Sequence, residues 1–272
     1  MKKALVLIVL LPALVLFASA TVATPAAQAA DPYDDTLGVS KSTAFVTDPV
    51  KFKGRVHTAS GKDAYGTVII QRRPASGGTW VNWRTDKLNR YGWFVKWAGM
   101  SAKGTWEFRA MMPGNGANDT GYSPVRTIKV YGPTTTEARV ITLVNRERAR
   151  RGLRPVRVRW HLTRSARYHA RDMAKRNRLT HYSSNGYSVG KRLLYFGYRR
   201  SGYRYWTVGE NIARGKAGTL YATPEAIVAS WMASYGHRKV MLRQVYRDVG
   251  VGVRKSTNGH YYYTLDMGRR VR

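Results

Sequence analysis

Apolar and polar residues alternate with a period of two between about residues 40 and 130, which is the pattern of half-buried β-strands. The clearest runs are Val50–Val56, Gly66–Gln71, Thr79–Trp83, Gly92–Trp97, Thr105–Ala110 and Val125–Val130. Turn-forming residues separate these runs, as at Pro74-Ala75-Ser76-Gly77-Gly78 and Pro113-Gly114-Asn115-Gly116. About seven short strands with turns between them predict an all-β, immunoglobulin-like sandwich over residues 31–131.

The pattern changes to a helical period after a linker at residues 132–136. Thr134 and Glu137 fit a capping box, and Val140, Ile141 and Val144 recur at helical spacing up to a stop at Gly152. Further helices are expected from about Thr163 to Leu179 and from Pro224 to about Ser234. Two strands, Asp248–Arg254 and His260–Met267, follow with a hairpin signal at Asn258-Gly259. Helices around a small antiparallel sheet predict a second, α/β/α domain over residues 137–272.

The first thirty residues have the layout of a secretory signal peptide. Lys2 and Lys3 precede an apolar stretch from Ala4 to Phe17, and small residues at Ala27-Gln28-Ala29 mark the expected cleavage site. The apolar stretch is shorter than the roughly 20 residues that a membrane-spanning helix needs. We therefore predict a secreted protein without a transmembrane span after cleavage. Retention of the segment as an uncleaved anchor is the alternative.

The chain is strongly basic, with a net charge of +32, and the charge is unevenly distributed. Residues 137–272 hold 30 Lys and Arg against 7 Asp and Glu, whereas residues 31–136 hold 15 against 8. Such a surface attracts polyanions. For an exported protein we expect anionic cell-wall polymers, glycans or lipids as partners rather than nucleic acid. A basic surface that is merely solvated is the alternative.

The sequence contains no cysteine, which excludes thiolate metal sites and cysteine nucleophiles. Three runs stand out, Leu179-Thr180-His181-Tyr182, Gly209-Glu210-Asn211-Ile212-Ala213 and Trp231-Met232-Ala233-Ser234-Tyr235-Gly236-His237-Arg238. If folding brings them together, two imidazoles and a carboxylate could bind zinc or carry out acid–base chemistry.

In order and spacing these runs resemble the CAP superfamily, or SCP domain, which includes cysteine-rich secretory proteins, antigen 5 and pathogenesis-related proteins. The resemblance covers about Thr134 to Gly268 and is to the cysteine-free bacterial type. It implies an α/β/α three-layer sandwich in which His181, Glu210 and His237 line one cleft, with Ser234 as a further candidate residue of the cleft. Ser234 stands where many members carry a second Glu, so a mechanism that needs two carboxylates is not expected.

The resemblance implies a secreted, envelope-associated protein that binds a ligand in this cleft, directly or through a metal. A metal-dependent hydrolase is the alternative, with zinc on His181, Glu210 and His237 lowering the pKa of a bound water and Glu210 as the candidate catalytic residue. A non-catalytic adhesion or scaffold protein acting through the β-sandwich is the third hypothesis. We expect binding rather than catalysis.

Other conspicuous residues are expected to be structural. The tryptophans of the β-sandwich, Trp80, Trp83, Trp93, Trp97 and Trp106, are predicted to pack mainly inward rather than to stack on sugars. The Tyr- and Arg-rich segment Leu193–Trp206 is predicted to pack beside the cleft and to form a rim for an anionic or glycan ligand. His169 and Asp172, at spacing i and i+3, share a helix face and could pair with each other. We expect no functional role for either residue. Asp266 is assigned no role.

Overall fold

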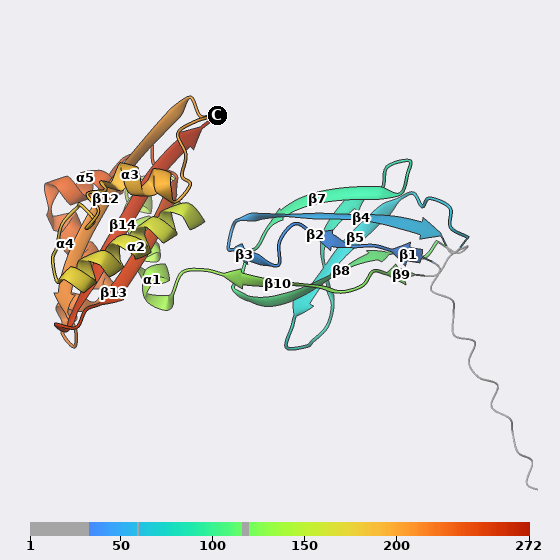
Figure 1. Ribbon diagram of the computed structural model, residues 1–272, viewed down its shortest axis with the longest axis horizontal. Helices are drawn as coiled ribbons and strands as arrows, with labels where there is room; N and C mark the ends of the chain where they lie inside the picture. Colours follow the sequence, from blue (N-terminus) through green and yellow to red (C-terminus); the bar gives the residue numbers. More distant parts are fainter. Residues whose placement is uncertain (1–32, 59, 116–119) are drawn as a thin grey trace, which may run out of the picture. The chain divides into compact units, whose positions relative to one another are not determined.

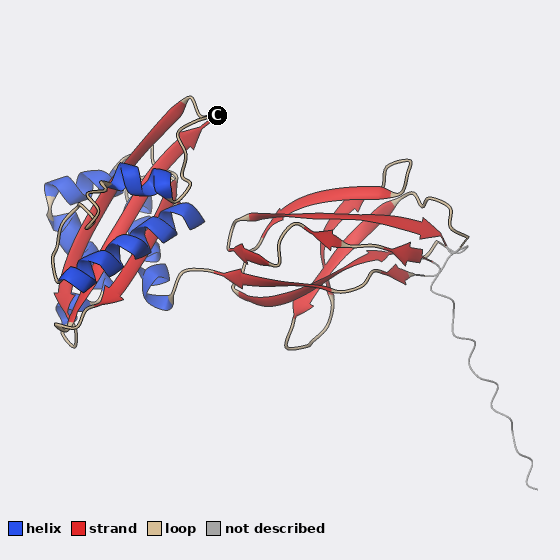
Figure 2. Ribbon diagram, viewed as in Figure 1, coloured by secondary structure: helices blue, strands red, loops and turns tan. Residues whose placement is uncertain are grey.

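The computed structural model describes residues 33–58, 60–115 and 120–272 (Figure 1). The predicted signal peptide, residues 1–30, lies outside the described residues. Within the described residues no helix is both long and apolar enough to cross a membrane. Figure 2 shows that the described chain up to residue 131, here the N-terminal region, is built from strands, whereas residues 132–272, the C-terminal region, combine helices and strands.

The N-terminal region contains two β-sheets. One sheet joins β1, β4, β2 and β7, and the other joins β3, β10, β8, β5, β6 and β9. The strands are β1 (Tyr33–Asp35), β2 (Gly38–Val39), β3 (Thr43–Phe45), β4 (Pro49–Thr58), β5 (Thr67–Pro74), β6 (Val81–Lys87), β7 (Trp93–Gly99), β8 (Gly104–Met112), β9 (Gly121–Tyr122) and β10 (Arg126–Tyr131).

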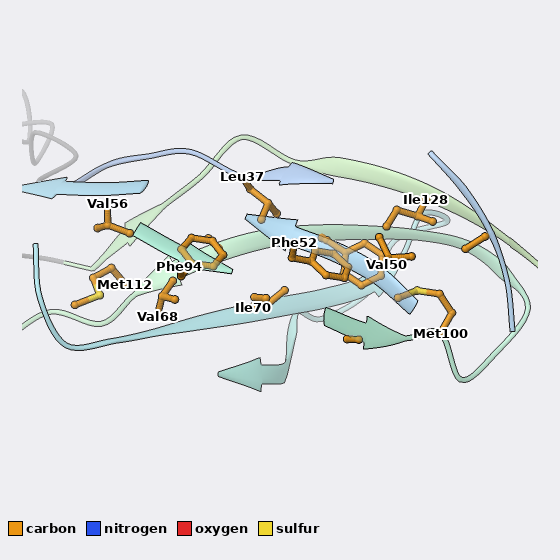
Figure 3. Close-up of a cluster of buried hydrophobic side chains, with 14 of the residues drawn as sticks. Leu37, Val50, Phe52, Val56, Val68, Ile70, Phe94, Met100, Met112 and Ile128 are labelled. Carbon is orange, nitrogen blue, oxygen red and sulfur yellow. The ribbon is translucent and has the colours of Figure 1, made fainter. Parts of the chain in front are cut away.

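Side chains from both sheets share one apolar core (Figure 3). Val50, Phe52 and Val56 of β4 face it at the predicted period of two, and the ring of Phe52 lies 5.1 Å from that of Phe108 on β8. The predicted β-rich character of this region is therefore confirmed. The immunoglobulin-like topology and the domain boundaries stay predictions.

The tryptophans of this region divide between core and surface. Trp83 and Trp106 pack against the apolar core, as predicted. The prediction is wrong for Trp93 and Trp97 of β7, which are 43% and 59% exposed. Phe94 takes the inward position on that strand instead, and strand alternation then turns both tryptophans outward.

The C-terminal region is organised around a four-stranded sheet in the order β11-β13-β14-β12. β14 pairs antiparallel with both β12 and β13, and β11 pairs parallel with β13. The elements are α1 (Thr135–Ala149), β11 (Arg157–Val158), α2 (Trp160–Arg176), α3 (Val189–Tyr195), β12 (Tyr205–Lys216), a 3-10 turn η1 (Leu220–Ala222), α4 (Pro224–Ala233), α5 (Tyr235–Leu242), β13 (Asp248–Lys255) and β14 (His260–Val271).

Helices cover both faces of this sheet, as predicted. Figure 1 shows α2 and α3 crossing in front of the strands, and on this face Met173 and Ala174 of α2 pack with Ile212 and Tyr262. Helices α1, α4 and α5 cover the opposite face. Their apolar side chains form a second cluster with the alternate residues of β13 and β14, among them Val140, Val144, Ile227, Trp231, Met241, Val249, Val251, Leu265 and Met267. The region is a three-layer α/β/α sandwich.

Local signals set most of the element boundaries. Thr134 and Glu137 form the predicted capping box, with the Thr134 backbone N–H donating to Glu137 Oε2 at 2.8 Å and the Glu137 N–H donating to Thr134 Oγ1 at 3.2 Å. Gly259 has φ +78°, as the predicted hairpin at Asn258-Gly259 requires. Helix α2 begins at Trp160, three residues before the expected Thr163, and ends at Arg176 rather than Leu179.

Two of the three candidate runs lie inside regular elements. Gly209-Glu210-Asn211 lies inside β12, and His237 lies inside α5. The polar residues Glu210 and Asn211 suggest a loop in sequence because a strand that is covered on both faces is normally apolar. In the fold both residues are buried, and each has a partner in the layer that it faces, Arg192 for the Glu210 carboxylate and the His237 carbonyl oxygen for Asn211 Nδ2.

Two glycines allow α2 to lie close against β13. A Cβ at Gly250 would be 2.1 Å from the carbonyl carbon of Leu162, and one at Gly252 would be 2.3 Å from that of Ala166. Only a residue without a side chain allows such an approach of backbone to backbone. The result fixes the middle of α2, with Ser165 and His169, above the centre of the sheet.

Candidate functional site

His181 and Glu210 are in direct contact. Asn177, with φ +52°, ends α2 in the left-handed conformation, and the chain then turns back so that His181 lies above β12. Its Nδ1 is 2.8 Å from Glu210 Oε1. The His181 side chain is 53% exposed, while that of Glu210 is 1% exposed. A buried carboxylate therefore orients an imidazole whose other side is open to solvent.

Arg192 contacts both His181 and Glu210 from the buried side of the site. It is fully buried on α3, and its Nη2 forms an ion pair with Glu210 Oε2. Its Nη1 donates to the backbone oxygens of His181, at 2.9 Å, and Tyr187, at 3.0 Å. One guanidinium thus positions both the Glu210 carboxylate and the backbone that carries His181, a task for which a planar fork of donors is suited.

A second acid, Asp266, lies beside Glu210. The two residues are register partners on β14 and β12, and Asp266 is fully buried. Ser165 Oγ of α2 donates to Asp266 Oδ2 at 2.6 Å. Burial, followed by the negative charge of Glu210, raises the pKa of the Asp266 carboxyl well above its usual range. The neutral form of the Asp266 carboxyl is therefore favoured beside the Arg192–Glu210 ion pair.

His169 completes the buried part of the site. Its Nε2 is 2.8 Å from the Thr180 carbonyl oxygen and its Nδ1 is 3.0 Å from Ser183 Oγ, so the proton belongs on Nε2 and the serine hydroxyl donates to Nδ1. Nε2 is also 3.9 Å from Glu210 Oε2. Burial lowers the pKa of His169 to about 4, which leaves the ring neutral at pH 7.

The expected pairing of His169 with Asp172 is wrong. Asp172 instead forms an ion pair with Arg176, one helical turn further along α2, and accepts from the Ser184 backbone N–H at 3.0 Å. His169 is turned inward, because its helix face is the one that rests on the sheet.

His237 approaches the site from the opposite helical layer. Asn211 of β12 donates from Nδ2 to the His237 backbone oxygen at 2.9 Å, which ties α5 to the edge strand. Burial, with the neighbouring charge of His181 as the smaller cause, lowers the pKa of His237. The two imidazoles are therefore electrostatic neighbours, although the described residues show no hydrogen bond between His237 and either His181 or Glu210.

Ser234 marks the junction between α4 and α5. It is the C-cap of α4 and the N-cap of α5, and it makes no side-chain capping bond. Its backbone oxygen accepts from the Arg238 N–H at 2.8 Å. Its position at the start of the helix that carries His237 supports a structural role.

The geometry does not fit a metal held by His181, Glu210 and His237. Both oxygens of Glu210 are engaged, one by His181 and the other by the Arg192 guanidinium, and a cation added there would meet a buried positive charge. Across residues 33–58, 60–115 and 120–272 no group of three His, Asp or Glu side chains is arranged as a metal site. Zinc binding stays a prediction from the sequence.

A hollow of about 720 Å³ lies on the α5 side of β12, whereas the Glu210 carboxylate meets Arg192 of α3 on the opposite face of this strand. Gly209 and Gly236, the sequence neighbours of Glu210 and His237, line it. Its other lining residues are the apolar or aromatic Val208, Tyr235, Val240, Leu242 and Tyr246 and the basic Arg238, Lys239 and Arg243. The arrangement suits a ligand that has both an apolar part and an anionic group.

The segment that we expected to wall the cleft packs inward at Leu193 and Tyr198, whereas most of its other residues are exposed. Tyr198 is fully buried, and Trp206 Nε1 donates to its carbonyl oxygen at 3.0 Å. Tyr195, by contrast, is 70% exposed. The packing expected of this segment is therefore present, and its role as a rim for a ligand stays a prediction.

Comparison with known proteins decides the family of the C-terminal region. Residues 141–267 match the model of the CAP family, described as the cysteine-rich secretory protein family. These residues form a CAP domain. The resemblance inferred from the three motifs is thereby confirmed, and the sheet, its helices and the His181–Glu210 site all belong to this CAP domain.

The relatives of the CAP domain include two proteins of Bacillus subtilis (strain 168). The uncharacterized protein YkwD is 38% identical over 116 residues, which are 43% of this chain and 41% of YkwD. The uncharacterized membrane protein YlbC is 31% identical over 137 residues, which are 50% of this chain and 35% of YlbC. The chain thus spans less than half the length of either relative.

Solved structures similar to the chain include an extracellular protein with an SCP domain from Bacillus anthracis, with 20% identity and a TM-score of 0.42, covering 62% of this chain and 66% of that one. A cysteine-rich secretory protein from Staphylococcus aureus has 13% identity and a TM-score of 0.36, covering 87% and 83%.

Three site residues were not predicted as such: Arg192, His169 and Asp266. Asp266 did carry a signal, since it is a lone acid inside the apolar strand Tyr261–Met267, and a buried lone acid needs a partner. Arg192 had none, because it is one of many arginines in its segment. Its function depends on burial, which the sequence pattern alone does not show.

Proposed function

We propose that this protein is an extracellular, envelope-associated CAP protein that binds a ligand at the His181–Glu210 site and is retained by anionic polymers through its basic surface. The observation that carries the first part is the contact of His181 Nδ1 with Glu210 Oε1 at 2.8 Å. A buried, arginine-held carboxylate fixes the imidazole orientation and leaves the outer edge of the ring for a ligand. Polar groups that are fixed by buried partners and open to solvent on one side are typical of a binding site.

The hollow on the α5 side of β12, the side from which His237 comes, supports a ligand of mixed character. Its apolar lining residues favour an acyl or aromatic part, and Arg238, Lys239 and Arg243 favour an anionic group. Lipids and wall fragments that carry carboxylates or phosphates have this composition. The predicted glycan or lipid partner is retained on these grounds as part of the proposal.

Two arms test the ligand site. Muramidase-solubilised cell-wall fragments and, separately, short-chain phosphatidylglycerol are titrated into the protein by calorimetry. We expect His181→Ala and His237→Ala each to weaken binding about tenfold, which corresponds to about 1.4 kcal/mol. His260→Ala, on the β13–β14 hairpin, is the matched control and should bind like the wild type. Equal binding by all four proteins would refute the proposed site.

Retention by the basic surface is tested on isolated cell walls. The screening length falls from about 10 Å at 0.1 M salt to about 3 Å at 1 M, so the protein should bind at low salt and be released at high salt. Retention that does not change with salt would refute the electrostatic part of the proposal.

No observation favours the hydrolase alternative. A second carboxyl group is present in Asp266, but it is fully buried and cannot reach a substrate. The adhesion or scaffold hypothesis stays a prediction from the sequence of the N-terminal region.

A further inference from the structure

Six arginines surround a polar hollow of about 310 Å³ at one end of the CAP sheet. We call it the arginine hollow. Its lining residues are Arg154, Pro155, Arg157, Arg159, Arg247, Asp248, Arg269 and Arg270. It is separate from the His181–Glu210 site, because the two sets of residues have no member in common.

Strand register explains why these arginines converge. Arg157 on β11 is the register partner of Asp248 on β13, and Asp248 is the partner of Gly268 on β14. Arg247 precedes Asp248, and Arg269 follows Gly268. Three distant stretches of the chain therefore present arginines at the same end of adjacent strands.

Several of the guanidinium groups are held in place. Arg159 Nε donates to Asp248 Oδ1 at 2.8 Å, and Arg247 Nη1 donates to the Tyr246 backbone oxygen at 2.7 Å. The Arg270 guanidinium lies over the ring of Tyr198, 4.1 Å from its centroid, and 4.6 Å from that of Tyr203. Groups fixed in this way lose little conformational freedom when a ligand binds.

The positive charge of the arginine hollow is not neutralised by the protein. Among its described lining residues Asp248 is the one acid, and both oxygens of this acid are engaged, by Arg159 and by the Tyr198 hydroxyl at 2.6 Å. Burial, and then the charges of Arg269 and Arg154, lower the pKa of Arg247. These guanidinium groups repel one another, so an anion placed among them is strongly favoured.

We propose that the arginine hollow binds phosphate groups of a linear, phosphate-bearing polymer. A planar carboxylate is satisfied by one guanidinium fork, whereas a tetrahedral phosphate accepts hydrogen bonds from several directions. Arginines that converge from three chain segments match the second geometry. The basic surface also continues past the hollow, because Arg272 lies 5.8 Å from the centroid of the same Tyr203 ring, which favours a chain of phosphates over a single ion.

This inference deepens the proposed retention by anionic polymers, since it names the site and the chemical group. Polymer binding spread over the whole basic surface would not depend on any two arginines. Binding in the arginine hollow would depend on Arg157 and Arg269, which lie on opposite edges of it, on β11 and β14.

The test measures binding of the full chain to inorganic polyphosphate at 0.15 M salt. We expect the double variant Arg157→Gln/Arg269→Gln to bind about tenfold more weakly than the wild type. The control Arg171→Gln/Arg178→Gln removes the same charge from exposed positions of α2 and the turn after it and should bind within about threefold of the wild type. Equal losses in the two double variants would overturn the proposal in favour of diffuse attraction.

Two further probes distinguish a phosphate polymer from a carboxylate polymer and from a lipid surface. Polyglutamate of matched charge should bind more weakly than polyphosphate, and tighter binding of polyglutamate would overturn the assignment to phosphate. Vesicles of phosphatidylglycerol test the lipid alternative: if the double variant loses vesicle binding but keeps polyphosphate binding, the polymer assignment is wrong. If the double variant does not fold, as judged by thermal unfolding, Arg154→Gln at the exposed rim replaces it and should lose about threefold.

The same variants separate this inference from the proposed function. If cell walls retain both double variants equally and salt releases them, the electrostatic retention stands and the arginine hollow is not its site. If polyphosphate binding depends on the arginine hollow but walls do not retain the wild type, the phosphate site stands and the proposed retention fails.

Discussion

Glu210 and Asp266 occupy directly opposed positions on β12 and β14, so that two carboxyl groups share one buried space with a single arginine. Glu210 forms an ion pair with Arg192, whereas burial and the charge of Glu210 favour the neutral form of Asp266. The two acids are therefore not equivalent, and substitution should reveal the difference.

Replacing Glu210 by Gln should cost much more stability than replacing Asp266 by Asn. Glu210→Gln leaves the Arg192 guanidinium buried without its counter-ion, which we expect to lower the free energy of unfolding by about 3 kcal/mol. Asp266→Asn replaces a neutral acid by a neutral group of similar shape and should cost about 1 kcal/mol. Urea denaturation at pH 7 measures both values. Equal costs would mean that Asp266 carries charge in the folded protein.

Arg192→Lys should destabilise the CAP domain although the charge is kept. A lysine ammonium has three donors, but its single nitrogen cannot occupy both positions from which Arg192 Nη2 reaches Glu210 and Nη1 reaches the His181 and Tyr187 carbonyl oxygens. We expect a loss of about 2 kcal/mol in the free energy of unfolding. Arg171→Lys on the exposed face of α2 is the control and should change stability by less than about 0.5 kcal/mol. An Arg192→Lys variant as stable as this control would contradict the positioning role.

Acid should destabilise the protein between pH 6.5 and about 4 through His169. The folded-state pKa of His169 is lowered to about 4, whereas an unfolded histidine titrates near about 6.5. The unfolded state therefore binds a proton in this window that the folded state does not, so stability falls as the pH is lowered. The full effect is about 3 kcal/mol.

The Asp266 carboxyl opposes this trend, because its raised folded-state pKa favours the folded state as the pH falls. The contribution of His169 is therefore isolated by comparing the pH dependence of unfolding in the wild type and in His169→Asn. The variant should lose less stability between pH 6.5 and 4. Parallel curves for the two proteins would show that His169 titrates normally in the folded state.

Elemental analysis of the purified protein for zinc tests the metal hypothesis directly. Because Arg192 already occupies Glu210, we expect purified protein to contain well under one zinc per chain by elemental analysis. A stoichiometric zinc that is absent from both His181→Ala and His237→Ala would show that Glu210 leaves Arg192 to bind a metal. His260→Ala serves as the matched histidine control.

Gly250→Ala should be strongly destabilising. Its Cβ would lie 2.1 Å from the Leu162 carbonyl carbon, and relief of this overlap requires α2 to move, at a cost of about 3 kcal/mol or more. Gly236→Ala in α5 is the control, since its Cβ would meet nothing within 4 Å, and helix propensity predicts a gain of up to about 1 kcal/mol. Thermal unfolding of the two variants gives the comparison, and a Gly250→Ala variant as stable as the wild type would contradict the close approach.

The features that sequence analysis predicted are those with local or motif signals. The Thr134–Glu137 capping box, the Asn258-Gly259 hairpin and the helix beginning at Pro224 depend on neighbours in the chain, and all three are present. His181 and Glu210 were placed together by their resemblance to a family, and the structure brings them into contact.

What could not be predicted depends on packing between distant elements. Arg192 and Glu210 meet because α3 packs on β12, and Asp266 faces Glu210 because of the β12–β14 register. Trp93 and Trp97 are outward because Phe94 takes the core position of β7. In each case the residue type allows two environments, and only the tertiary fold decides between them.

The seating of α2 on Gly250 and Gly252 has a mechanical consequence for the His181 site. Because the backbone of α2 contacts the backbone of β13 directly, α2 cannot shift without a steric clash. Ser165 and His169 of α2 therefore keep fixed positions below the site. Asn177, which ends that helix, frees the following turn from this restraint. Conformational adjustment to a ligand is therefore confined to the residues around His181. The Arg192–Glu210 ion pair and Asp266 beneath it keep their arrangement.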